Sequence, residues 1–267
     1  MNLDLSLLKI ATTGCDFGRQ IRSFTEISST QDYAISIAET DPNSHGMVIT
    51  SESQSSGRGR RDKRWISPPG GLWFSVIIKS DLRSISAVYL SYAMSLALCE
   101  TITNNFNLDA FVKWPNDVLI KGRKVAGILI SSAIRGDDLE YCVVGAGINL
   151  NSRPKGLKGS TSLIEHISRS SIAIEPVLAS VLVLFDNYYN KIRSGNWELI
   201  KSRWKLHCPM MGKKIKAEVK GVQFEGVASN IDSDGCLILV TTGGLKLKIS
   251  DTQNAYFGIS SGDNGNP

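Results

Sequence analysis

The sequence is poor in cysteine and histidine and has no long apolar run. Its five cysteines are odd in number and lie far apart, so they predict neither a disulfide framework nor a zinc site. The three histidines, His45, His166 and His207, have no mutual spacing that suggests a metal site. No stretch approaches about eighteen uninterrupted apolar residues, and no signal peptide is recognisable at the N-terminus. We therefore expect a cytoplasmic protein with reduced thiols, no metal site of its own and no membrane partner.

Several catalytic and nucleotide-binding signatures are also missing. Nothing resembles a Walker A loop, a Ser-His-Asp set or a metalloprotease helix. The run Gly145-Ala146-Gly147-Ile148-Asn149 lacks the third glycine of a dinucleotide fingerprint, and no helix pattern follows it directly. Its small residues still allow a ligand to lie against a strand. The sequence supplies cations, amides and a carboxylate without an obvious nucleophile, which suits chemistry in which bound ligands provide the reacting groups.

The apolar patterns predict an α+β fold. Apolar residues recur at steps of three and four from 85 to 106, which is typical of one face of a long helix. Strand patterns at 118–120, 124–130 and 141–151 are separated by short turns, which favours antiparallel pairing. We expect a mixed, largely antiparallel sheet with helices packed on it in residues 1–208. Short alternating strands then predict a small C-terminal β-barrel in residues 209–259, followed by a disordered tail at 260–267.

The positive charge of the chain is concentrated between residues 57 and 65, a segment that we call the arginine loop. It has the sequence Gly-Arg-Gly-Arg-Arg-Asp-Lys-Arg-Trp and a charge of +4, whereas the whole chain carries +5. Gly57 and Gly59 let the backbone bend and let a ligand approach. Strand patterns at 47–50 and 72–78 anchor the loop at both ends. Charge alone favours a solvated loop or a nucleic-acid patch, and the anchoring favours a small anionic site.

Other polar residues lie at the ends of predicted elements. Lys113 and Lys124 flank the first strand of the hairpin, and each on its own would be a solvated charge. Their rigid apolar neighbours favour a functional role. Asn116-Asp117 predicts either an Asx turn or a carboxylate placed beside the lysines. Ser29 and Thr30 precede a helical run and predict an N-cap, which is compatible with a second use of their hydroxyls in a pocket.

Four motifs taken together resemble the biotin protein ligases in order and spacing. They are the arginine loop, Lys113-Trp114-Pro115-Asn116-Asp117, Lys124-Val125-Ala126-Gly127-Ile128-Leu129, and residues 145–149. The resemblance covers roughly residues 24–258 and implies a class II synthetase-like core. It also implies two reactions: biotin and ATP, with Mg²⁺, form biotinyl-AMP, and a lysine of a biotin carboxyl carrier domain then displaces AMP.

The resemblance also implies roles for individual residues. The expected biotin contacts are Ser29, Thr30, Gln31, Gln54, Arg58, Gly59, Arg60, Lys124, Gly127 and Gly147. The expected nucleotide contacts are Arg58, Arg60, Trp65, Lys113, Asn116, Lys124 and Asn149. Arg60, Lys113 and Lys124 are expected to act in catalysis, and Asp117 is expected to help deprotonate the acceptor lysine. Residues 152–162 match the family's loop that orders over the adenylate.

The sequence departs from the family pattern at two positions and is short at its front. Asp62 stands where glycine is frequent, and Gln31 stands where asparagine is common. About two dozen residues precede the core, too few for the winged helix-turn-helix of some members, so we expect a ligase that does not bind DNA. The alternatives are a lipoate or octanoate ligase and a nucleic-acid-binding module. The oligomeric state is left open, with a homodimer as one option.

Overall fold

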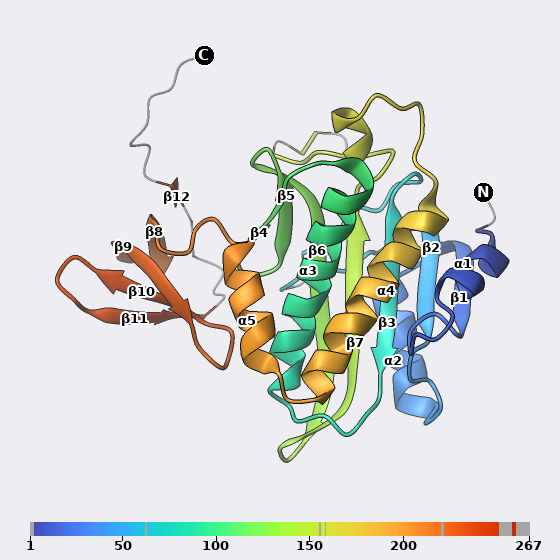
Figure 1. Cartoon of the computed structure of the whole chain (residues 1–267), viewed down its shortest axis with the longest axis horizontal. Coiled ribbons are helices and arrows are strands. Elements are labelled where there is room, and N and C mark those ends of the chain that lie inside the picture. The colour runs from blue at the N-terminus through green and yellow to red at the C-terminus, as the bar shows by residue number, and fades with distance from the viewer. Residues whose placement is uncertain are drawn as a thin grey trace. The chain divides into compact units, whose positions relative to one another are not determined.

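The computed structural model in Figure 1 describes residues 3–61, 63–154, 156–157, 159–219, 222–250 and 258–259. The chain divides into two compact units. The first consists of Met1–Val112 with Asn116–His207, and the second of Lys113–Pro115 with Cys208–Pro267. Asp62 and the expected tail at 260–267 lie outside the described residues.

A seven-stranded sheet organises the first unit. Its strand order is β1 (Ile21–Ile27), β2 (Val48–Gln54), β3 (Leu72–Ile78), β7 (Asp138–Ile148), β6 (Arg123–Arg135), β5 (Asp117–Ile120) and β4 (Ala110–Lys113). β1 and β2 pair in parallel, whereas the pairs β2–β3, β3–β7, β7–β6 and β6–β5 are antiparallel. The predicted α+β class with a mixed, largely antiparallel sheet is confirmed.

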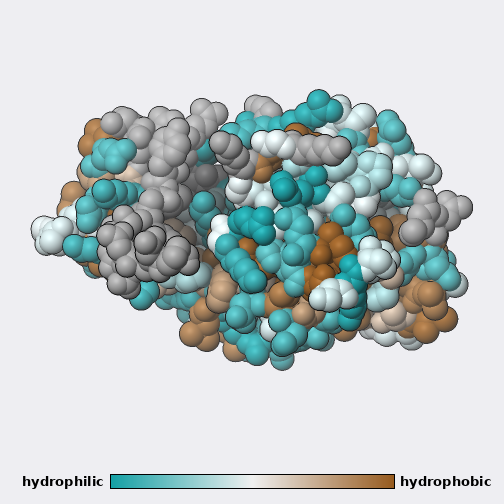
Figure 2. All heavy atoms as spheres, turned by 90° about the horizontal axis from the view of Figure 1, so that it is seen from above, coloured by the Kyte–Doolittle hydropathy of each residue, from teal (hydrophilic) through white to brown (hydrophobic). Residues whose placement is uncertain are grey.

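The helices of the first unit pack on this sheet and on one another. They are α1 (Leu5–Ala11), α2 (Thr30–Thr40), α3 (Ser86–Phe106), α4 (Ile174–Arg193) and α5 (Trp197–Leu206), with a short 3₁₀ helix, η1, at Leu163–His166. The long helices α3 and α4 run side by side in front of the sheet in Figure 1. β3 is buried along its whole length because both of its faces are covered. On the face shown in Figure 2, hydrophobic residues form small groups among hydrophilic ones, since most large apolar side chains are in the core.

Helix α2 packs on strands β2, β3 and β7. Ser29 caps it, with its side-chain oxygen accepting a hydrogen bond from the Asp32 N–H at 3.2 Å. Further along, α2 packs its buried face on Ile49, Ile77 and Val143. The predicted N-cap is therefore present, and it places the first turn of α2 against β2, β3 and β7.

The second unit is built on a five-stranded antiparallel sheet. Its order is β11 (Lys246–Ile249), β10 (Leu237–Thr241), β9 (Val222–Ile231), β8 (Lys214–Val219) and β12 (Gly258–Ile259). The expected small barrel is thus present as a small C-terminal sheet, but the described residues do not close it, because β11 and β12 remain at opposite ends of the strand order. Trp114 belongs to this unit, and its Nε1–H donates to the Gly235 carbonyl at 2.9 Å.

In the part of the chain that the structure describes, we find no helix that is both long enough and apolar enough to span a bilayer.

Candidate active site

Three glycines leave one face of the sheet flat near the N-terminal end of α2. Gly127 on β6 is paired directly with Gly147 on β7, and Gly145 lies two residues further along β7 on the same face. A Cβ atom on Gly127 would come within 3.0 Å of Trp65, and one on Gly147 within 2.5 Å of the Trp65 indole nitrogen. We call these three residues the glycine floor, and at Gly127 and Gly147 the missing side chains let a flat group lie directly against the backbone.

A hydrogen-bonded network of polar side chains adjoins the floor at the start of α2. Gln54 Oε1 accepts from the Thr30 backbone N–H at 2.8 Å and from the Thr30 hydroxyl at 3.1 Å. Gln54 Nε2 in turn donates to the Ser67 hydroxyl at 2.7 Å. Ser75 Oγ, fully buried on β3, lies 3.0 Å from Thr30 Oγ1. The structure therefore joins Thr30 directly to Gln54, with Ser29 next in the chain, and their contact with biotin remains a prediction.

Gln31 extends this network across the sheet. Its Nε2 donates to the Ser131 hydroxyl at 3.0 Å and to the Val143 carbonyl at 3.1 Å, and its Oε1 accepts from Ser75 at 3.0 Å. The side chain is only 3% exposed and covers Gly145, where a Cβ atom would lie 2.3 Å from Gln31 Oε1. Because both amide hydrogens have protein partners, Gln31 forms a fixed wall at one end of the floor. Sequence reasoning did not single out Ser75 and Ser131, since only the strand pairing places them here.

The arginine loop crosses from β2 to β3 above these strands. Within it, the Gly59 N–H donates to Lys63 O at 2.7 Å and the Trp65 N–H donates to Gly57 O at 2.8 Å. Arg58 forms an ion pair with Asp32 in the first turn of α2, with 2.8 Å between Nε and Oδ1. The loop is thus folded back on itself and tied to α2.

A second contact ties the loop to the start of β5. Arg60 Nη1 lies 3.3 Å from the side-chain oxygen of Asn116. Asn116 is itself held by β6, because its side-chain nitrogen donates to the Ile128 carbonyl. The loop therefore lies between two elements that carry predicted site residues, and its described part contacts both.

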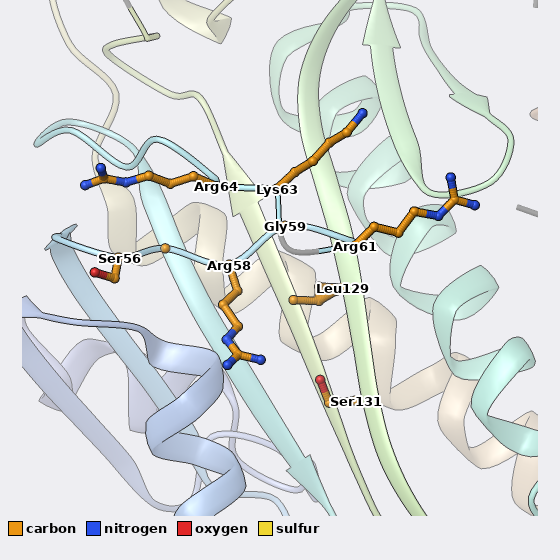
Figure 3. Close-up of a pocket in the computed structure, with 9 residues that line it drawn as sticks. Ser56, Arg58, Gly59, Arg61, Lys63, Arg64, Leu129 and Ser131 are labelled. Carbon is orange, nitrogen blue, oxygen red and sulfur yellow. The ribbon is translucent and has the colours of Figure 1, made fainter. Parts of the chain in front are cut away.

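The described part of the loop borders a hollow of about 400 Å³. The lining residues are Ser56, Gly57, Arg58, Gly59, Arg61, Lys63, Arg64, Leu129 and Ser131. Figure 3 shows the four cationic side chains diverging from the loop in different directions. They do not converge on one point, so the hollow lacks the geometry of a single anion site. Leu129 and Ser131 line it from β6, on the face that also carries Gly127.

Lys124 lies at the other end of the glycine floor. Its ammonium is 2.5 Å from an Asp117 oxygen, and both side chains are about one-quarter to one-third exposed, at 34% and 23%. The same nitrogen stands 4.9 Å from the centroid of the Trp65 ring, a cation–π arrangement. Of the two interpretations of Asn116-Asp117, the structure shows the one that places a carboxylate beside Lys124.

Asn149 is buried next to Lys124 and has an unused acceptor. Its backbone N–H donates to Val125 O, and its side-chain nitrogen donates to Thr161 O at 2.9 Å. The side-chain oxygen is buried and has no hydrogen-bond partner. The chain at Gly159 and Thr161 also bonds the Lys124 backbone, at 2.8 Å in each case. An unsatisfied buried oxygen is unfavourable, so a ligand N–H donor at this point would be stabilising.

Glu165 holds the loop that follows Asn149. Its carboxylate accepts hydrogen bonds from Ser162 at 2.9 Å and from Arg153 at 2.8 Å, and it lies 3.2 Å from Arg123. Burial by itself would raise the pKa of Glu165, but the hydrogen bonds from Ser162 and the charge of Arg153 outweigh it, so the pKa is lowered. The carboxylate is therefore stabilised in its charged form and fixes the end of this loop.

Lys113 belongs to a different unit of the chain from the other predicted site residues. It belongs to the second unit together with Trp114, whereas Asn116 and Asp117 belong to the first. Its expected contact with the nucleotide and its role in catalysis remain predictions.

Comparison with known proteins bears on these residues. The model of the biotin/lipoate A/B protein ligase family matches residues 23–149. The bifunctional ligase/repressor BirA of Bacillus spizizenii is 30% identical over 225 residues, which cover 82% of this chain and 69% of that protein. The biotin–acetyl-CoA-carboxylase ligase of Paracoccus denitrificans is 28% identical over 198 residues, which cover 72% of this chain and 82% of that protein.

Solved structures agree at the level of the fold. The biotin protein ligase from Aquifex aeolicus, in complex with biotin and ATP, gives a TM-score of 0.73 at 24% identity and covers 91% of this chain and 100% of that one. The predicted resemblance to biotin protein ligases is confirmed, and the chain belongs to the biotin/lipoate A/B protein ligase family.

Proposed function

We propose that this protein is an ATP-dependent biotin ligase. A carboxylate oxygen of biotin attacks the α-phosphorus of ATP, which gives biotinyl-5′-AMP and releases pyrophosphate. The amine of a carrier-domain lysine then attacks the acyl carbon, loses a proton and displaces AMP. The observation that carries the proposal is the glycine floor, which has neutral hydrogen-bonding groups at one end and Lys124 with the unsatisfied Asn149 oxygen at the other.

This arrangement matches a ligand with an apolar middle and two different polar ends. Thr30 and Gln54 offer hydroxyl and amide groups to the ureido ring of biotin, with Ser29 fixing the start of α2. The fused rings lie on Gly127 and Gly147, where no Cβ obstructs them. The carboxylate then lies towards Lys124, where its charge is neutralised.

Electrostatics is the main contribution of the protein to the first step. A carboxylate and a triphosphate repel each other, and cations placed around their meeting point lower that repulsion. We assign this role to Lys124, Arg58, Arg60 and Lys113, with Trp65 and Asn116 bordering the nucleotide. Gly59 keeps a Cβ away from the Lys63 carbonyl, which would be 2.8 Å from it, and so permits the tight turn that carries Arg60.

Mg²⁺ enters this scheme with ATP. Within the described ranges there is no group of three histidine, cysteine or carboxylate side chains placed to hold a metal ion. Magnesium is usually held by substrate phosphates together with one or two carboxylates, and the residues named above would bind the ATP complex through charge and hydrogen bonds. The ion would supply further charge neutralisation at the phosphates.

Asp117 has two roles in this proposal. As the partner of Lys124 it orients the ammonium before the ligands bind. When Lys124 turns to the anionic ligand, the carboxylate is released and becomes available to take the proton of the acceptor lysine.

We further propose a catalytic domain at 1–208, a C-terminal domain at 209–259 and a biotin carboxyl carrier domain as the protein partner. A cytoplasmic location would supply both ATP and the reducing conditions that suit five free cysteines. DNA is not a ligand in this proposal, and a homodimer is an option that sedimentation would test.

The decisive experiment is incubation with ATP, Mg²⁺, biotin and a carrier domain, followed by mass spectrometry of the carrier. We expect the mass of one biotinyl group on one lysine, and pyrophosphate exchange into ATP that depends on biotin. Lipoate and octanoate are tested in parallel, because the matched family includes ligases for lipoate. Exchange that depends on lipoate alone would favour the alternative, and salt-sensitive DNA binding without exchange would favour a nucleic-acid module.

A further inference from the structure

Trp65 occupies the place that the proposed function gives to biotin. Its indole lies so close to Gly127 and Gly147 that a Cβ on either residue would come within 3.0 or 2.5 Å of it. It also makes an edge-to-face contact with Trp73, whose strand partner is Gly147. A flat aromatic group of this chain therefore rests on the glycine floor, where a flat bicyclic ligand would lie.

The position of Trp65 leaves one polar group unsatisfied. The indole Nε1 is buried and has no hydrogen-bond partner. A buried tryptophan usually directs this donor to a carbonyl, as Trp73 does towards Pro68 O at 3.1 Å, although the core residue Trp204 also leaves its Nε1–H unpaired. The apolar contacts hold the ring on the floor, while the unpaired donor makes that position easier to leave.

We propose that the Trp65 side chain occupies the place on the glycine floor where biotin binds. Biotin must therefore displace this side chain in order to bind. This inference rests on the proposed function. The ring leaves the floor by rotation of its side chain, because the backbone on either side is anchored. The Trp65 N–H is bonded to Gly57 O, and two residues further on Ser67 O accepts from the Gln54 N–H.

Displacement has a consequence for Lys124. In the structure the ammonium is paired with Asp117 and faces the indole ring at 4.9 Å. When the indole ring leaves, the side of the Lys124 ammonium that faces the glycine floor is exposed. An anionic ligand carboxylate arriving there replaces the cation–π contact with a stronger charge pair. The same event that empties the floor thus prepares Lys124 for the ligand.

Gln31 behaves differently from Trp65, although it also covers a glycine of the floor. All the polar atoms of its amide are hydrogen-bonded, to Ser75, Ser131 and Val143. Moving Gln31 would break three hydrogen bonds, whereas moving Trp65 breaks none at its indole nitrogen. The proposal therefore assigns the exchange with ligand to Trp65 alone and keeps Gln31 in place.

Fluorine NMR tests the inference on the whole chain. Labelling with 5-fluorotryptophan gives one resonance for each of the five tryptophans, and Trp65→Phe and Trp197→Phe identify two of them. Trp197 is the matched control, because it starts α5 and its Nε1–H is already bonded to Ile192 O. On adding biotin we expect the Trp65 resonance to shift and to gain the H₂O/D₂O isotope shift of a solvent-exposed ring, while Trp197 stays unchanged.

Calorimetry on the same samples tests biotin binding separately from the displacement of Trp65. If calorimetry detects biotin binding but the Trp65 resonance neither shifts nor gains the isotope shift, the proposed displacement is wrong. The assignment as a biotin ligase would then remain intact. No biotin binding by the labelled wild-type protein would overturn the proposed function and this inference with it. The NMR readout requires no variant to bind ligand, since the two substitutions serve only to assign resonances.

Discussion

At the scale of single residues, Lys124 is the charged side chain that lies against one end of the glycine floor. Lys124 is held by Asp117 at 2.5 Å, and its ammonium lies 4.9 Å from the centroid of the Trp65 ring. Other basic residues around it, such as Arg58 and Arg60, contact the elements that flank the floor. We therefore expect Lys124 to be the cation that the ligand carboxylate meets first.

We predict that Lys124→Ala abolishes adenylate formation and leaves the fold intact. Loss of one well-placed electrostatic group typically lowers kcat by about a hundredfold or more. Biotin-dependent pyrophosphate exchange measures the step, and circular dichroism checks the fold. The matched control is Lys121→Ala, because Lys121 is an exposed lysine three residues earlier in the turn. Normal exchange by Lys124→Ala would remove this residue from the mechanism.

A second residue-scale prediction concerns Arg60. Its contact with Asn116 links the arginine loop to the start of β5, so Arg60→Ala should loosen the loop over the adenylate. We expect biotinyl-AMP to escape and to biotinylate nearby lysines at random, read by mass spectrometry of added bovine serum albumin. Lys63→Ala is the control within the same loop, because Lys63 is an exposed cation and its side chain extends in Figure 3 in the opposite direction to that of Arg58. Retention of the adenylate by Arg60→Ala would contradict the assigned role.

The residues of the site were predictable from sequence only where a local rule applied. Ser29 was visible as an N-cap, and Lys124 and Asn149 were visible through motifs. Ser75 and Ser131 carry no such signal, because they join the site through pairing of β3, β7 and β6. A tertiary hydrogen-bond network has no period along the chain, so no window of sequence contains it.

At the scale of elements, periodicity and turn chemistry predicted most of the long helices and strands. The apolar pattern from 85 to 106 became α3, and the strands at 118–130 became the β5–β6 hairpin. Helix α1 was missed, although Asp4 caps it by accepting from the N–H groups of Ser6 and Leu7. Two of its apolar residues, Leu7 and Ile10, are exposed, so its pattern has no clean buried face.

The loop that ends at Glu165 carries a prediction about pH. The Glu165 pKa is lowered in the folded protein, so its stabilisation is present above the unfolded pKa of about 4.3 and is lost as pH falls through the folded value. Glu165→Gln should reduce the free energy of unfolding by on the order of 1 kcal/mol near pH 7 and by much less below pH 4, since the pair with Arg153 is partly exposed.

Urea denaturation at several pH values measures this difference. Glu140→Gln is the control, because Glu140 makes a surface ion pair with Arg135 near the far end of the β6–β7 hairpin. A difference between wild type and Glu165→Gln that stays constant from pH 7 to pH 4 would contradict the lowered pKa.

At the scale of the whole molecule, the division of the chain was only partly visible in the sequence. The change to short alternating strands after residue 212 marked the second sheet. Closure into a barrel was expected and is absent from the described strand order, because closure depends on how the end strands meet and not on their alternation. The excursion of Lys113–Pro115 into the second unit had no sequence signal, since it follows from tertiary contacts of Trp114.

Because Lys113–Pro115 belongs to the second unit, we expect the motif residue Trp114 to stabilise that unit. Trp114 is 2% exposed and its Nε1–H bonds the Gly235 carbonyl in the β9–β10 turn. Trp114→Phe keeps most of the apolar burial and removes this donor, so it should lower the stability of the second unit by about 1–3 kcal/mol. Ser233→Ala in the same turn is the control, because its hydroxyl is exposed and lies 3.5 Å from Asp234. Hydrogen exchange of β8 to β11 should accelerate in Trp114→Phe and not in the control. Equal exchange in the two variants would mean that the Lys113–Pro115 segment is carried by the second unit without supporting it.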